Sequence, residues 1–240
     1  MQLPDGQLES ITNTLQFVLE DCVRAGRAAG DELPQLSRAI EQLAQVLGRL
    51  EADAGGGNPA GATDVTEIGE YALRLADNLA VCAERAGLPD SRLTLGRLHV
   101  DIALWIARNH GVIETLDPVV DAIALLANSM RDPHELEIFS ESIARVVAAV
   151  APQIRADLEK LNPGRPWRVL LLNQSIIATR SHNTGLMERA FEQLTGALPE
   201  EAGRFFTEGM QQMDALDYPD HVRRLMQKYH RQWSVNRSLH

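Results

Sequence analysis

The chain has 240 residues, of which 45% are hydrophobic and 23% are charged, a composition typical of a globular protein with a large buried core. Its formal net charge is −10, which argues against nucleic-acid binding because phosphate contacts require a basic surface. There are two cysteines, too few for a disulfide framework, and no apolar run reaches the length of a bilayer crossing. We therefore expect a cytoplasmic protein with no membrane partner and no nucleic-acid partner.

Apolar residues recur at helical spacing along nearly the whole chain, and no segment is convincing as a strand. The spacing predicts a first helix over 6–25 and a second that aligns Leu36 with Leu50. Together they make an N-terminal helical hairpin, residues 1–52. Residues 53–64 contain three consecutive glycines and a proline, which indicates a flexible linker. We expect residues 65–240 to form the main helical body.

Capping residues and prolines mark the helix starts of this body. Asp64 precedes Glu67 by three residues, the spacing of a capping box, and Ser91 is placed to cap the next helix. Prolines at a first helical position mark later starts, at Asp117-Pro118, Asp132-Pro133, Pro199 and Pro219. Pro152 interrupts a long helical pattern, so we expect a kink or a break there.

The predicted fold class is all-α. About ten helices joined mostly by short turns form antiparallel hairpins, because a short connection makes successive helices neighbours. Such hairpins either stack as an α-α superhelix or close into a multi-helical bundle, and the sequence leaves both arrangements open.

The C-terminal third resembles a degenerate tetratricopeptide repeat. Phe191 stands eight residues before Pro199, as the second-helix aromatic and the closing proline do in that family. Phe205 and Gly209 follow where the first-helix aromatic and glycine of the next repeat would stand. The resemblance covers at most residues 168–233, and it implies a helical scaffold that binds partners in a groove.

This region also departs from the family, because Met187 and Leu194 stand where the repeat has alanine and the first-helix tyrosine is absent. Seven of the eleven aromatic residues follow residue 166, and aromatic and methionine side chains are frequent on adaptable binding surfaces. The candidate partner-binding residues are Trp167, Arg168, Gln174, Met187 and Phe191.

The most apolar run, residues 165–183, carries three consecutive polar residues in its middle. On a helical wheel Gln174 lies at the centre of one apolar face, Asn173 lies between two faces, and Ser175 lies on a third side. Only Gln174 is therefore expected to be buried and to need hydrogen bonds. It is either a core amide bonded to a neighbouring turn, the preferred interpretation, or a groove residue that holds a partner's backbone.

Candidate chemistry is sparse. His99 lies on an apolar helix face, where a histidine either donates to a neighbouring carbonyl or serves as a base with a shifted pKa. Asp117 and Asp121 lie four residues apart on one helix face, a spacing that can hold magnesium, although a helix N-terminus also favours acids. No zincin, phosphate-loop or hydrolase motif occurs, so we expect no resident metal and no cofactor.

The last helix combines basic and aromatic residues, but its apolar side chains gather on one face, as packing side chains do. The sequence therefore predicts a non-enzymatic cytoplasmic scaffold or adaptor that binds other proteins, and it leaves self-association as a homodimer open. The alternative is an all-helical enzyme or small-ligand-binding protein with a site near His99 or the Asp117/Asp121 pair.

Overall fold

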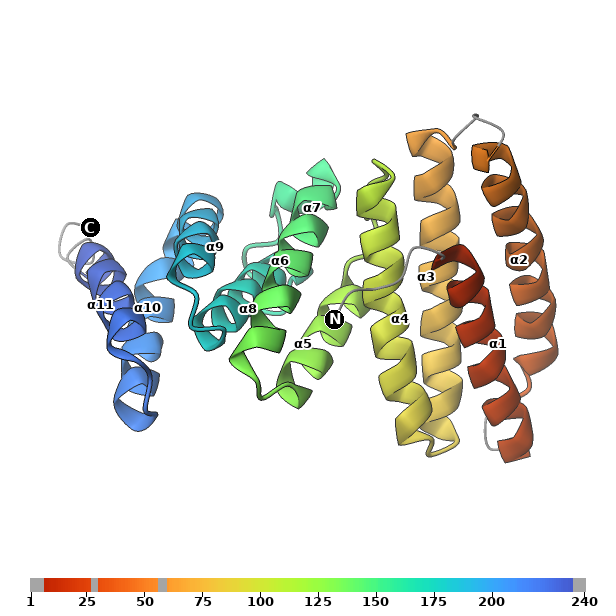
Figure 1. The fold of residues 1–240 in the computed structure, drawn as a ribbon, viewed down its shortest axis with the longest axis horizontal. Helices are drawn as coiled ribbons and strands as arrows, with labels where there is room; N and C mark the ends of the chain where they lie inside the picture. The colour runs from red at the N-terminus through yellow and green to blue at the C-terminus, as the bar shows by residue number, and fades with distance from the viewer. Residues whose placement is uncertain (1–6, 27–29, 56–59, 235–240) are drawn as a thin grey trace. The chain divides into compact units, whose positions relative to one another are not determined.

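The computed structural model describes residues 7–26, 30–55 and 60–234. Within them the chain forms eleven helices and no strand, which confirms the predicted all-α class (Figure 1). The helices are α1 (Gln7–Ala25), α2 (Leu33–Gly55), α3 (Ala62–Arg85), α4 (Pro89–Arg108), α5 (Asp117–Ser129), α6 (Pro133–Ala149), α7 (Pro152–Arg155), α8 (Pro166–Arg180), α9 (Thr184–Ala197), α10 (Pro199–Ala215) and α11 (Asp220–Ser234). Among these helices, none combines the length and the apolar composition that a membrane crossing requires.

The helices divide into two compact units. The N-terminal unit extends as far as Ser129 and also takes in Ala148–Ala156. The C-terminal unit comprises Met130–Val147 and the residues from Asp157 onward. This division differs from the predicted one, because the first hairpin shares a unit with α3–α5 and the predicted main body divides after Ser129.

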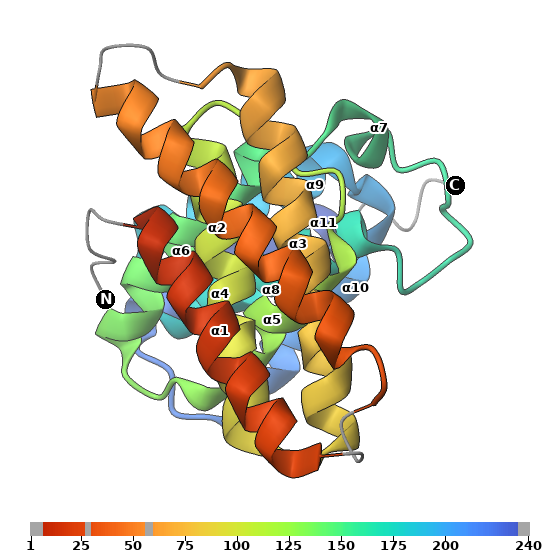
Figure 2. The same cartoon turned by 90° about the vertical axis from the view of Figure 1, so that its right-hand side faces the viewer.

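In the N-terminal unit, α1 pairs with α2 and also packs against α3 and α4, while α5 packs against α4 (Figure 2). The apolar stripe predicted for the first helix is the reason, since Leu15, Val18 and Cys22 are all fully buried. The hairpin thus covers its apolar faces on the chain's own third and fourth helices. The predicted linker is shorter at both ends, because α2 continues to Gly55 and α3 begins at Ala62; residues 56–59 lie outside the described part.

The predicted helix caps are only partly correct. Helix α3 begins before Asp64, and its N-cap is Gly61 without a side-chain bond, so the capping-box prediction is wrong. Ser91 does not cap α4, which begins at Pro89. Its hydroxyl instead donates to Asp21 of α1 at 2.9 Å. Asp132 does accept a hydrogen bond from the backbone N–H of His134 at 3.1 Å, as expected of a cap.

The break expected at Pro152 is confirmed. Helix α6 ends at Ala149 and α7 begins at Pro152. Between them, the chain forms a short bridge with Ile113, whose N–H donates to the Ala149 carbonyl while its own carbonyl accepts from the Ala151 N–H. These two bonds fasten Ala148–Ala156 to the loop before α5.

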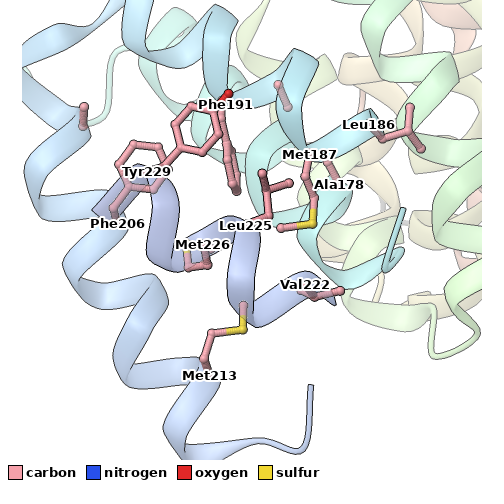
Figure 3. Close-up of a cluster of buried hydrophobic side chains, with 12 residues drawn as sticks. Ala178, Leu186, Met187, Phe191, Phe206, Met213, Val222, Leu225, Met226 and Tyr229 are labelled. Atoms are coloured by element: carbon pink, nitrogen blue, oxygen red, sulfur yellow. The ribbon is translucent and has the colours of Figure 1, made fainter. Parts of the chain in front are cut away.

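In the C-terminal unit, α8 pairs with α9 and α10 pairs with α11. Three rings form the centre of the core, where Phe191 meets Phe206 and Tyr229 edge-to-face at centroid distances of 5.1 Å each (Figure 3). Such pairs stabilise a core beyond simple burial. Met213 lies at the other end of the cluster, away from the rings. The last helix packs through one face, as predicted, since Val222, Leu225, Met226 and Tyr229 are all buried.

Candidate functional site

Four of the five candidate partner-binding side chains lie inside the C-terminal unit. Trp167, Gln174, Met187 and Phe191 are between 0% and 5% exposed. Arg168 is nearer the surface, but Glu201 of α10 occupies its guanidinium. The four buried side chains therefore offer no surface on which a partner could bind. Their apolar and aromatic character reflects packing of α8 and α9, which sequence alone could not separate from a binding surface.

The three polar residues of α8 do not all lie where the helical wheel predicted. Gln174 is buried as expected, but its Oε1 has no hydrogen-bond partner among the described residues. Ser175 was predicted to lie on a third side of the helix and not to be buried. It is fully buried, and its hydroxyl donates to the Leu171 carbonyl at 2.9 Å. The following residue, Ile176, is the one that faces outward, at 45% exposure.

Ile176 borders an apolar groove of about 410 Å³ between α8, α10 and α11. Gly209 of α10 helps to shape it, because the side chain of Met226 lies so close that a Cβ at Gly209 would come within 2.8 Å of its sulfur. Leu216, at the end of α10, is 51% exposed beside the same groove. The lining residues are Ile176, Thr179, Arg180, Phe205, Glu208, Gly209, Gln212, Met213, Leu216, Tyr218 and Met226; Figure 3 shows Met213 and Met226.

Three of the polar side chains that line this groove have partners within the protein. The Thr179 hydroxyl donates to the Ser175 carbonyl at 2.8 Å, and Arg180 donates to the Met130 carbonyl at 2.8 Å. Glu208 accepts from Arg204 at 2.7 Å. With those groups engaged, recognition in the groove rests on apolar and sulfur-containing side chains, which favour binding over acid–base chemistry.

A second pocket, of about 180 Å³, lies where α3, α4 and α5 meet in the N-terminal unit. His99 of α4 borders it and is 4% exposed. Its Nδ1 lies 2.8 Å from the Leu95 carbonyl, which is the bond to a neighbouring carbonyl that the sequence suggested. Burial lowers the pKa of His99, against the opposing effects of the Leu95 carbonyl, Asp77 and Asp121, which favours the neutral form of the ring.

Only one member of the predicted aspartate pair borders this pocket. Asp121 borders the His99 pocket, whereas Asp117 does not. The described residues contain no cluster of three or more histidine, cysteine, aspartate or glutamate side chains that could hold a metal ion. Asp77 of α3 joins His99 and Asp121 instead, and sequence reasoning missed it because a single acid on a helix has no distinctive pattern.

The loop before α5 determines where Asp121 lies. Glu70 of α3 is buried, and its carboxylate accepts from the backbone N–H groups of Glu114 and Thr115 at 2.8 and 3.2 Å. A carboxylate bound by two N–H groups fixes a loop firmly. It therefore holds the start of α5 against α3, which brings Asp121 to the same pocket as Asp77.

Comparison of the chain with protein-family models, with curated proteins and with solved structures finds no match.

Proposed function

We propose that this protein is a non-enzymatic, cytoplasmic interaction scaffold whose C-terminal unit binds an amphipathic helix of another protein. The groove between α8, α10 and α11 is the docking site. Helix α8 of the first hairpin and both helices of the α10–α11 hairpin line it, and a groove between neighbouring hairpins is what the tetratricopeptide-like spacing of Phe191, Phe205 and Gly209 implies.

One observation carries the proposal. Ile176 and Leu216 are 45% and 51% exposed, and both border the apolar groove. Large aliphatic side chains that face water beside an apolar groove are unfavourably hydrated. A partner that covers them gains about 25 cal/mol per Å² of apolar surface removed from water.

The chemistry of the groove selects the occupant. Its lining includes the partly buried Phe205 and, beneath the exposed Ile176 and Leu216, Met213 and Met226 at 1% exposure each; methionine side chains adjust readily to the apolar face of a helix. About 410 Å³ accommodates a few large aliphatic or aromatic side chains, which is what a helix presents at positions i, i+3 or i+4, and i+7. A second copy of this chain is the competing occupant.

Charge substitution on the groove tests the proposal. Ile176→Glu and Leu216→Glu place a carboxylate on the apolar surface at side chains that are already about half exposed. Leu161→Glu is the matched control, because Leu161 is 101% exposed and does not border the groove. In pull-downs from the native cell, we expect both groove variants to lose a defined partner that wild type and the Leu161 variant retain.

All three variants should show the melting temperature of the wild type, because the substituted side chains are exposed. Retention of the same partner by both groove variants would contradict the proposal, and so would its loss from the Leu161 control. If the chain co-purified only with a second copy of itself, the occupant of the groove would be that copy and not a helix of another protein.

A further inference from the structure

The turn between α8 and α9 meets the loop between α10 and α11 through two histidines. The ring of His182 packs edge-to-face against the ring of Tyr218, with centroids 5.5 Å apart and 71° between the ring planes. His221, in the first turn of α11, places its Nε2 3.0 Å from the His182 carbonyl. Because a carbonyl only accepts, this Nε2 is the donor. His182 therefore contacts the loop through its side chain and α11 through its backbone.

The backbone around His182 is held on both sides. Its φ of 60° is a left-handed conformation that residues other than glycine adopt uncommonly. The His182 N–H donates to the Thr179 carbonyl at 3.2 Å. The next residue, Asn183, caps α9, since its side chain accepts from the Leu186 N–H at 3.1 Å. These bonds fix the turn that carries the His182 ring.

Two guanidinium groups lie near the corner formed by His182, Tyr218 and His221. Arg180 of α8 acts electrostatically on the Tyr218 phenol. Arg223 of α11 donates to the Tyr218 carbonyl at 3.0 Å and thereby holds the loop. A positive charge on His182 would therefore add to a region that is already basic.

The neighbouring carboxylates do not offset such a charge. They are Glu137 of α6 and, on either side of Tyr218-Pro219, Asp217 and Asp220. Glu137 accepts from the Asn183 amide at 2.7 Å and lies 3.6 Å from His134, while both aspartates are exposed. The charged group that acts on the His182 ring is His221, and protonated histidines repel each other.

Burial lowers the pKa of His182, and His221 lowers it further. The neutral ring is therefore the form that the packed corner favours. A base whose pKa is lower in the folded state stabilises the fold fully above its ordinary pKa, here 6.5. This contribution is lost as the pH falls through the folded pKa. Burial raises the pKa of Tyr218, so the phenol stays neutral over the same range.

The corner can open without unfolding α11. Val222 and Leu225 are buried in the apolar cluster, which holds the helix from its first turn onward (Figure 3). Tyr218 is only partly buried at the edge of this cluster, and it also lines the groove between α8, α10 and α11. Loss of the contact with His182 would therefore affect the loop and the groove first.

We propose that His182 and His221 form a pH-sensitive latch on the groove. With His182 neutral, its ring stays against Tyr218 and keeps that side chain in the groove lining. When His182 takes up a proton, its ring moves into water, Tyr218 loses its cover, and the loop between α10 and α11 opens. The effect of the latch on partner binding rests on the proposed function, whereas the opening itself does not.

Hydrogen exchange of the free, full-length chain tests the latch. Amide exchange is followed by NMR at about pH 7.5 and about pH 5, on either side of the ordinary histidine pKa. The rates are expressed as protection factors, which removes the intrinsic pH dependence of exchange. The Val222 and Arg223 N–H groups both donate to the Pro219 carbonyl. We expect their protection to fall roughly threefold or more at the lower pH, while protection around Phe191 in the centre of α9 stays unchanged.

Two substitutions remove the titrating ring in different ways. His182→Phe keeps an aromatic ring against Tyr218, so protection should stay high at both pH values. His182→Asn tolerates the positive φ but lacks the ring, so protection should be low at both. His230→Gln removes a histidine from the same helix more than two turns beyond His221, and this control should respond to pH as wild type does.

A wild type without the pH response would overturn the latch, and so would a response that persists in either His182 variant. An equal loss of protection around Phe191 would also overturn it, because the whole unit would then be opening. These measurements involve no partner, so they distinguish a failed latch from a failed docking groove. If both are correct, the partner captured through Ile176 and Leu216 should bind several-fold more weakly at the lower pH.

Discussion

Arg168 of α8 binds Glu201 of α10 through two parallel hydrogen bonds. Its Nε donates to one carboxylate oxygen, and its Nη2 donates to the other at 2.8 Å. Both side chains are mostly buried, at 15% and 17% exposure. The pair therefore links the first helices of the two C-terminal hairpins by a geometry that arginine offers and lysine does not.

The pair predicts a pH dependence of stability. The hydrogen bonds from Arg168 lower the pKa of Glu201 below its ordinary value of 4.5. A carboxyl whose pKa is lower in the folded state stabilises the fold above its unfolded pKa, and this contribution is lost as the pH falls through the folded pKa. Glu201→Gln should cost about 1–3 kcal/mol at pH 7. The difference from wild type should shrink below about pH 4.5, as followed by urea unfolding.

Glu208→Gln is the control for that experiment. Glu208 pairs with Arg204 on the same helix, and both side chains are more than half exposed. An exposed pair contributes little, so this variant should unfold nearly as wild type does at both pH values. A loss as large as that of Glu201→Gln would show that removing a carboxylate from α10, rather than breaking the Arg168 pair, causes the effect.

Asp101 in α4 should show the opposite pH dependence. Burial raises the pKa of Asp101 from 3.8 to about 6, against the lowering effect of Arg108 and Arg97. The contribution of Asp101 to the free energy of unfolding is fully present below its unfolded pKa. It is lost as the pH rises through about 6, the folded pKa. Asp101→Asn should therefore raise the free energy of unfolding on the order of 1–3 kcal/mol at pH 7. At about pH 4 the gain should vanish, and equal gains at both pH values would contradict the assignment.

Two glycines of the N-terminal unit should respond to alanine in opposite directions. A Cβ at Gly69 of α3 would overlap the side chain of Ile106, whereas a Cβ at Gly48 of α2 meets nothing within 4 Å. Gly69→Ala should destabilise by about 1–3 kcal/mol through overpacking. Gly48→Ala should stabilise by up to about 1 kcal/mol through helix propensity. Thermal melting of the two single variants checks this. A change in melting temperature of the same sign in both variants would refute the close approach of α3 and α4.

Much of this fold follows from local pattern. The stripe through Leu15 and Cys22 predicted both a helix and its buried face, and Pro152 predicted the end of α6. These succeed because helical periodicity and proline geometry act within a few residues. Ser91 shows the limit, since its partner is Asp21, seventy residues earlier, and no local rule anticipates a bond that only tertiary packing creates.

The candidate sites show the same limit. His99 and Asp121 could be selected from their positions on a helix, but that Asp77 borders the same pocket depends on three helices packing together. The groove depends on the outward placement of Ile176, which the apolar character of the segment does not indicate. Whether an apolar face is covered is a property of the packed unit, which the periodicity of one helix does not contain.

Gln174 provides a direct test of the core of α8. Because its Oε1 is buried without a partner, Gln174→Met should leave stability unchanged or raise it by about 1 kcal/mol. Ser175→Ala should instead cost about 0.5–1.5 kcal/mol, since the serine hydroxyl has a buried acceptor in Leu171. Urea unfolding distinguishes the two, and a marked loss in the Gln174 variant would mean that the amide is bonded after all.

Photo-cross-linking from the groove tests the central claim most directly. A photoreactive amino acid is placed at Ile176 or at Leu216, with Leu161 as the exposed control, and the cross-linked peptides from the native cell are sequenced. We predict that both groove positions capture one segment of another protein, through apolar residues spaced three or four apart. Capture of this chain's own peptides, or of the same peptides from Leu161, would contradict the account.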